Sequence, residues 1–129
     1  MQIFEKFISV CNDDIDHLNH VNNIRYLRWI QQIAKEHWNS ITTKNQREKN
    51  VWIVIRHEID YKAPAFIGDK LKLKTYVSEC KGATCTREVE IINSKTSKIL
   101  VKSKTNWCII NPKTKQPKRI PNELLNIFD

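Results

Sequence analysis

Residues 13–29, DDIDHLNHVNNIRYLRW, concentrate side chains that can do chemistry. Carboxylates and imidazoles alternate over a few positions, and a pair of asparagines and an amphipathic run follow at once. Three explanations compete for such a cluster: a metal site, a helix cap and an active site. The side chains in question are Asp14, Asp16, His17, His20, Asn22 and Asn23.

The spacing argues against a metal. His17 and His20 are three residues apart at the start of an expected helix, whereas a helical zinc motif places its histidines four apart. The D-x-D run also lacks the glycine and the downstream glutamate of a calcium loop. We therefore expect no metal here.

Helix capping accounts for part of the cluster. Asp and Asn oxygens accept bonds from the free N–H groups at a helix start, and their charge or dipole suits that end. Capping needs one or two such residues, however, and not this many together. A helix N-terminus can also hold an oxyanion, and a carboxylate just ahead of it can act as base or nucleophile. From the residue types alone, the cluster can be interpreted as a helix cap or as a catalytic site.

The elements that would position this cluster follow from periodicity. Residues 2–10 are expected to form a short strand, 11–19 a polar loop and 39–50 a loop with a short helical piece. Between these loops apolar residues recur every three or four positions, which predicts a helix from Val21 onward that is enclosed on several sides. The predicted buried stripe is Ile24, Leu27, Ile30, Ile33, Ala34, His37 and Trp38, widened by Tyr26 and Trp29.

Period-2 alternation then predicts four strands, 51–61, 70–77, 84–92 and 98–110, joined by short turns. In the first of them the odd positions, including Ile53, Ile55 and His57, are expected to share one apolar face. Short hairpin connections imply an antiparallel sheet. We predict an α+β fold in which a curved, five-stranded antiparallel sheet wraps around one long central helix. The segment NELLNIF is expected to add a last helical turn.

Composition sets the broad class. The chain has 129 residues, of which 40% are hydrophobic, and this suits a single domain over residues 1–129. No apolar run is long enough for a membrane span, and the charged N-terminus does not resemble a signal peptide. We therefore expect a cytoplasmic protein with reduced, mostly buried cysteines. Only two glycines are present, which excludes a Rossmann fingerprint and a P-loop.

The net charge of +8 favours acidic partners such as phosphorylated cofactors, acidic carrier proteins or nucleic acid. The basic residues are dispersed along alternating patterns, so solvated strand faces explain most of them. Five of them are candidates to meet the phosphates of an acidic substrate. They are Lys81, Lys113, Lys115, Lys118 and Arg119.

The run D-x-D-x-x-x-H-V-N-N-x-x-Y-L-R-W resembles hotdog-fold thioesterases of the 4-hydroxybenzoyl-CoA thioesterase type, and H-V-N-N-x-x-Y is also similar to plant acyl-ACP thioesterases. The segments IDYKAPAFIGDKLKLKT and NPKTKQPKRIP extend the resemblance over almost the whole chain. It implies a hotdog fold, hydrolysis of acyl-CoA or acyl-carrier-protein thioesters in fatty acid metabolism, and no cofactor beyond the coenzyme A of the substrate. It also implies a homodimer or homotetramer.

The resemblance assigns roles to individual residues. Asp16 matches the catalytic carboxylate, and the backbone N–H of Asn23 matches the donor to the thioester carbonyl. His20 and Glu79 match a histidine and a glutamate of the plant enzymes, which carry an asparagine where this chain has Leu18. Asn19 stands where the bacterial motif has glycine, and asparagine tolerates the left-handed backbone that this turn needs.

Substrate contacts are expected around the carbonyl and the acyl chain. The candidates are Val21, Asn22, Tyr26, His57 and Lys81. For His57, its place on the apolar strand face favours a core histidine with satisfied hydrogen bonds over a role in the acyl pocket. A non-catalytic acyl-binding or regulatory domain is the main alternative function, because one fold hosts several functions. A nucleic-acid binder has only the charge in its favour, since no recognition motif is present.

Overall fold

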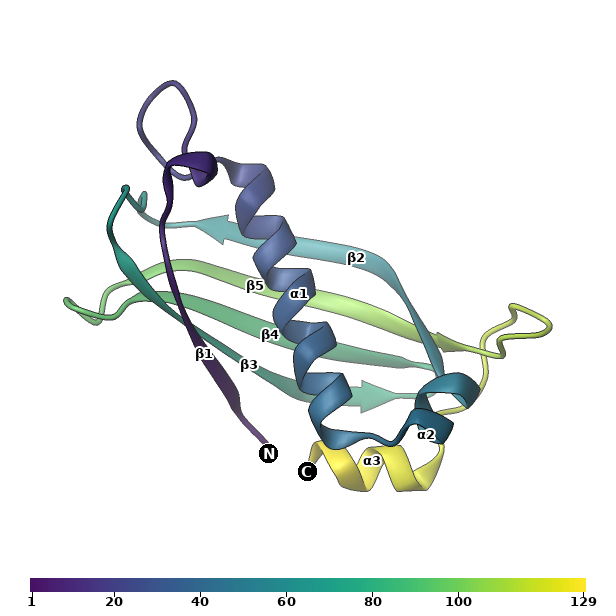
Figure 1. Cartoon of the computed structure of the whole chain (residues 1–129). Coiled ribbons are helices and arrows are strands. Elements are labelled where there is room, and N and C mark those ends of the chain that lie inside the picture. Colours follow the sequence, from purple (N-terminus) through teal and green to yellow (C-terminus); the bar gives the residue numbers. More distant parts are fainter.

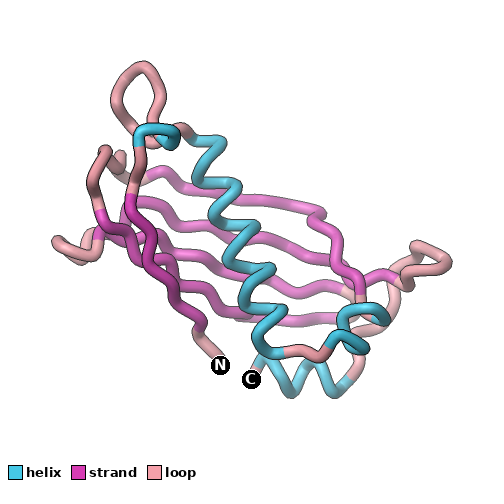
Figure 2. Tube along the Cα trace, in the orientation of Figure 1, coloured by secondary structure: helices cyan, strands magenta, loops and turns pink.

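A single antiparallel sheet curves around one long helix in the computed structural model, which describes residues 1–129 (Figures 1 and 2). This confirms the predicted α+β arrangement. In chain order the elements are β1 (Phe4–Ser9), a 3-10 turn (Asn12–Asp14), α1 (Asn23–Ile41), α2 (Lys44–Lys49), β2 (Val51–Tyr61), β3 (Lys70–Lys81), β4 (Thr84–Asn93), β5 (Ile99–Ile110) and α3 (Asn122–Phe128).

The five strands follow the order β1-β3-β4-β5-β2, and every neighbouring pair is antiparallel. Tight turns join β3 to β4 and β4 to β5, as the turn sequences predict. The strands β1 and β2 form the two edges. Two short helices, α2 and α3, lie together beyond the C-terminal end of α1 (Figure 1). No helix is long and apolar enough to cross a membrane.

The long helix buries one face only. Its buried residues are Tyr26, Ile30, Ile33, Ala34 and His37. Ile24, predicted to be in this stripe, is 64% exposed, because its position on the helix points it about 120° away from Ile30 on the buried face. Gln31, Gln32 and Lys35 on the opposite face are also exposed. The expectation that the helix is enclosed on several sides is therefore wrong for this chain, in which the sheet covers one side of α1.

The strand β2 does not keep the single apolar face that alternation predicted. Its pairing with β5 shifts register between Val54 and Arg56, so Ile55 is the extra residue of a bulge. Val54 before the bulge and His57 after it both face α1, while Ile53 and Ile55 are 44% and 55% exposed. One added residue reverses the alternation, because successive strand side chains point to opposite faces.

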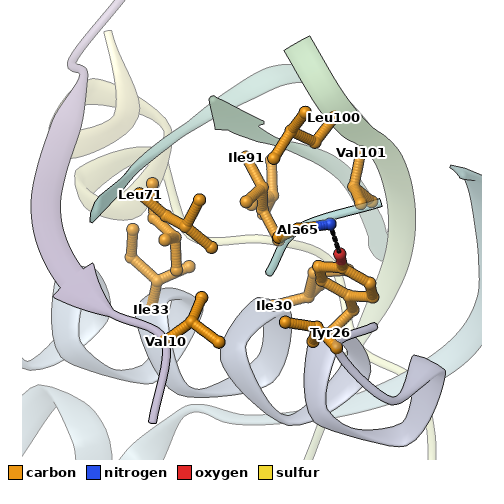
Figure 3. Close-up of a cluster of buried hydrophobic side chains, with 12 residues drawn as sticks. Val10, Tyr26, Ile30, Ile33, Ala65, Leu71, Ile91, Leu100 and Val101 are labelled. Atoms are coloured by element: carbon orange, nitrogen blue, oxygen red, sulfur yellow. Dashed lines mark hydrogen bonds between the residues drawn. The ribbon is translucent and has the colours of Figure 1, made fainter. Parts of the chain in front are cut away.

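The core lies between α1 and the sheet in two clusters. The larger one surrounds the N-terminal half of α1 and includes Tyr26, Ile30 and Ile33 (Figure 3). The Tyr26 hydroxyl accepts a 3.2 Å hydrogen bond from the backbone N–H of Ala65, which ties the helix to the connection between β2 and β3. The smaller cluster lies at the other end, where α3 packs on the sheet through Leu124 and Phe128.

The cysteines differ from the expectation of reduced, buried thiols. Cys80 and Cys85 form a disulfide, because the β3–β4 hairpin places them directly opposite each other. Cys11 is a free, exposed thiol, and Cys108 is free and buried. Sequence spacing alone did not indicate this pairing, since it depends on the register of the hairpin.

A buried polar group joins α1 to the sheet. The Arg87 guanidinium donates from Nη1 to His37 Nδ1 at 2.8 Å and to Thr75 Oγ1 at 3.1 Å. All three side chains are at most 5% exposed. Burial, with the nearby positive charge of Arg87, lowers the pKa of His37 from 6.5 to about 4. His37 is therefore neutral at pH 7 and accepts the bond through Nδ1.

Acidification is expected to destabilise the fold through His37. Its pKa is lower in the folded state, so only the unfolded chain takes up this proton between pH 6.5 and about 4. The contribution to the free energy of unfolding is complete above pH 6.5 and falls by up to about 3 kcal/mol toward pH 4. Urea unfolding of wild type and His37→Gln across this range measures the difference. Gln accepts the same bond without titrating, so an equally steep pH dependence in both proteins would contradict the assignment.

Candidate active site

The segment between β1 and α1 is held in place by backbone bridges. Ile15 pairs with Val21, and His20 pairs with Phe66 of the β2–β3 connection. The Val21 N–H donates to the Ala65 carbonyl at 3.0 Å. The loop that carries the predicted catalytic residues is therefore fastened to the body of the fold on both of its sides.

Asp16 lies half-buried at the start of a tight turn in this loop. Its Oδ1 accepts from the backbone N–H groups of Leu18 at 2.8 Å and His20 at 3.3 Å. Asn19 has a φ of 65°, which confirms that asparagine takes the left-handed position expected of this turn. Oδ2 of Asp16 has no partner within the chain, so one carboxylate oxygen is uncommitted.

The N-terminus of α1 leaves one donor free. Asn22 is the N-cap, and its side chain accepts from the Ile24 N–H at 3.0 Å. The Asn22 carbonyl accepts from the Arg25 N–H at 2.8 Å. The Asn23 N–H has no acceptor in the chain. A free amide at the positive end of a 19-residue helix is suited to an anion or a polarised carbonyl.

Asp14, to which the sequence assigned no role, is structural. Its Oδ1 lies 3.0 Å from Arg25 Nε, and its Oδ2 accepts from the Cys11 N–H at 2.8 Å. Arg25 Nη2 also donates to the Asp13 carbonyl at 3.0 Å. Arg25 thus joins the loop to the first turn of α1, a contact that its position on the helix did not reveal. No group of His, Cys, Asp and Glu side chains in the structure is placed to hold a metal ion.

Apolar side chains surround the loop. The His20 ring packs edge-on against Phe66, with 5.2 Å between ring centroids. Phe66 itself is 46% exposed, and neighbouring positions in the chain are exposed as well. An exposed apolar surface beside a carboxylate and a free amide suits the hydrocarbon part of a ligand. The exposed apolar residues lie on the loop with the first turn of α1 and on the β2–β3 connection. They are Leu18, Ile24, Phe66 and Ile67.

Of the other candidates, Val21 and Tyr26 lie beside the junction with buried side chains, and His57 lies on β2. Tyr26 and Val21 are each only 3% exposed and belong to the core. His57 is half-buried on β2; its Nδ1 lies 2.9 Å from Thr105 Oγ1 and its Nε2 3.4 Å from Gln31 Nε2. Burial lowers its pKa. It has the hydrogen bonds of a core histidine.

Glu79 and Lys81 of one chain lie far in space from Asp16 of the same chain. The first residue of β3, Lys70, pairs with Ser9 just ahead of the Asp16 loop. Glu79 is nine residues further along β3, roughly 30 Å at the rise of an extended strand. The family resemblance could not reveal this separation, because it depends on the direction of β3 relative to α1.

Comparisons with known proteins converge on one family. Residues 10–128 match the family model of the thioesterase-like superfamily. A 74-residue segment, 57% of this chain, is 27% identical to a chloroplastic acyl-(acyl-carrier-protein) hydrolase of Cuphea viscosissima. The match spans only 18% of that plant protein's length.

Solved structures share the fold. A 1,4-dihydroxy-2-naphthoyl-CoA thioesterase from Synechocystis superposes with a TM-score of 0.85 at 17% identity, over 98% of this chain and 96% of its own. A probable thioesterase from Bartonella henselae gives a TM-score of 0.76 at 27% identity, over 92% of this chain and 98% of its own. The architecture is thus the hotdog fold that the motif resemblance implied.

Removing the N-cap should destabilise α1 and its loop. Asn22→Ala deletes the acceptor for the Ile24 N–H, and we expect the free energy of unfolding to fall by about 1 kcal/mol. Asn22→Ser, which can cap in the same way, should restore most of the loss. Urea unfolding at pH 7 measures both. Equal stability of Asn22→Ala and wild type would show that the cap does not support the helix start.

Proposed function

This chain belongs to the thioesterase-like superfamily, and on that premise we propose that it hydrolyses an acyl thioester of coenzyme A or of an acyl-carrier protein. One observation carries the proposal: an uncommitted carboxylate oxygen and an uncommitted amide donor occur at the same loop–helix junction. These groups belong to Asp16 and Asn23. Thioester hydrolysis needs both a base or nucleophile and an electrophilic donor.

The reaction begins with the thioester carbonyl against the backbone of Val21, Asn22 and Asn23. Asp16 either attacks the carbonyl carbon or removes a proton from the attacking water. The carbonyl oxygen gains the negative charge, and the Asn23 N–H and the helix dipole stabilise it. One such donor is worth about 3 kcal/mol in the transition state. The thiolate then leaves; if an acyl-aspartate has formed, water hydrolyses it to the free acid.

The surroundings of the junction suit an acyl substrate. The exposed Leu18, Ile24, Phe66 and Ile67 offer apolar contact to the acyl chain. The His20 ring packs against Phe66, and its proposed role is to orient water or Asp16. The net charge of +8 favours the phosphates of coenzyme A or an acidic carrier protein. The proposed reaction requires no metal or organic cofactor beyond the coenzyme A of the substrate.

A non-catalytic acyl-binding protein is the second candidate function. Oδ1 of Asp16 already accepts the Leu18 and His20 N–H groups, so this carboxylate also stabilises its own turn. A protein that bound acyl-CoA without hydrolysing it would use Asp16 only in that way. Hydrolysis assays on wild type separate the two functions directly.

Asp16→Asn is expected to reduce the turnover of acyl-CoA by about 100-fold or more, the usual contribution of a general base. Asn keeps an acceptor oxygen for the turn, so the variant should fold. A panel of acyl-CoA substrates with a free-thiol reagent measures release of coenzyme A. Asp13→Asn is the matched control, because it removes the same charge from an exposed side chain in the same loop. Unchanged hydrolysis by Asp16→Asn would overturn the role of this carboxylate.

The protein is also expected to assemble as a dimer or a dimer of dimers. The edge strand β2 leaves backbone groups unpaired and exposes Ile53 and Ile55 beside them, a combination that favours strand addition. Sedimentation equilibrium at micromolar concentration should therefore give twice or four times the chain mass of 15.3 kDa. A stable monomer would contradict this expectation.

A further inference from the structure

A second feature suited to a ligand lies at the other end of α1. There the helix, α2, the sheet and α3 enclose a cavity of about 550 Å³, within the range of small-molecule sites. Its wall is mainly apolar, and Gln31, Lys35 and Asn39 stand exposed at its rim. The large apolar side chains of the wall are Trp38, Trp52, Val54, Trp107 and Phe128.

Arg87 is part of this wall and carries a buried charge without a counter-ion. It is 5% exposed, and none of the ion pairs in the structure includes it. Its protein partners, His37 and Thr75, are both uncharged. Burial lowers the pKa of Arg87 to about 10, and no carboxylate opposes that effect. A buried cation is costly unless an anion pairs with it.

The other polar groups of the wall also lack a negative partner. No Asp or Glu lines the cavity, while Lys35 and Arg47 add positive charge to that of Arg87. The indole N–H groups of Trp52 and Trp107 are buried without an acceptor in the chain. Asn50 Oδ1 is a buried acceptor of the wall that also lacks a partner. The wall thus carries positive charge and no negative charge, so an anionic group is what it lacks.

We propose that this cavity binds a small carboxylic acid with an apolar body, the carboxylate pairing with Arg87 and the hydrocarbon packing against the tryptophans. A carboxylate matches the planar fork of a guanidinium and would supply the missing negative charge. The apolar walls favour a hydrocarbon or ring over a polar metabolite, because burial of apolar surface drives such binding.

The site is separate from the thioester junction. His37, the partner of Arg87 on α1, lies fourteen residues after Asn23, about 21 Å along the helix. The carboxylate can come from a free acid or from the far end of a dicarboxylic acyl group. Binding of a free acid involves no reaction, so the inference goes beyond the proposed hydrolysis and does not depend on it.

The first test is a titration with octanoate and with octanol of the same chain length. Three of the four tryptophans, Trp38, Trp52 and Trp107, line the cavity, so tryptophan fluorescence reports its occupation. We expect saturable binding of octanoate, at least tenfold tighter than octanol. Equal affinities, or no binding of either compound, would overturn the proposal.

Variants locate the site. Arg87→Gln should lower the affinity for octanoate at least tenfold and leave the affinity for octanol unchanged. Val54→Phe keeps Arg87 and places a bulkier side chain in the cavity, so it should weaken the binding of both compounds even where Arg87→Gln folds poorly. Ile99→Phe adds a ring at the exposed start of β5, outside the cavity wall, and should bind like wild type. An unchanged octanoate affinity in Val54→Phe would overturn the proposal.

Competition identifies the source of the carboxylate. Octanoate bound to the Asp16→Asn variant, in which hydrolysis is suppressed, is challenged with hexadecanedioyl-CoA, whose extended acyl chain is long enough to reach Arg87 from the junction, and with palmitoyl-CoA. Displacement by hexadecanedioyl-CoA alone assigns the carboxylate to the far end of an acyl group, and displacement by neither assigns the site to free acids. Displacement by both would place octanoate in an ordinary acyl site and overturn the role of Arg87.

Discussion

The packing of α1 against one face of the antiparallel sheet is the contact on which the rest of the molecule depends. Tyr26, Ile30 and Ile33 are almost fully buried there, and each would cost several kcal/mol to truncate. The helix spans much of the length of the sheet, so its two ends lie in different surroundings (Figure 1). One end meets the loop that carries Asp16, and the other forms a wall of the cavity beside Arg87.

At the N-terminal end of α1, the residues that hold the loop and the helix together are also the candidates for catalysis. Asn22 caps the helix, Arg25 ties the loop to its first turn, and Asp16 closes the turn between them. After these bonds are made, the Asn23 N–H and one oxygen of Asp16 remain without partners in the chain. A capping network is thus compatible with the proposed catalytic pair, which is why the capping and catalytic interpretations could not be separated from the residue types alone.

Several features were predictable because they depend on local chemistry. The 3.6-residue period located α1, and period-2 alternation with turn residues located β3, β4 and β5. Asn19 could be expected to take the left-handed backbone. Other features were not predictable. The exposure of Ile24 depends on which face of α1 the sheet covers, and the bulge at Ile55 is set by pairing with β5. The Cys80–Cys85 disulfide depends on hairpin register.

The sequence by itself determined the elements, the fold class and the loop–helix junction around Asp16 and Asn23, because each depends on residues close together in the chain. Only the tertiary structure decided which candidates share a site. It separated Glu79 from Asp16 along β3, and it brought Arg87 to His37, fifty positions away, beside a cavity without acidic side chains. Contacts of that kind depend on strand order and direction, which no local pattern of residues encodes.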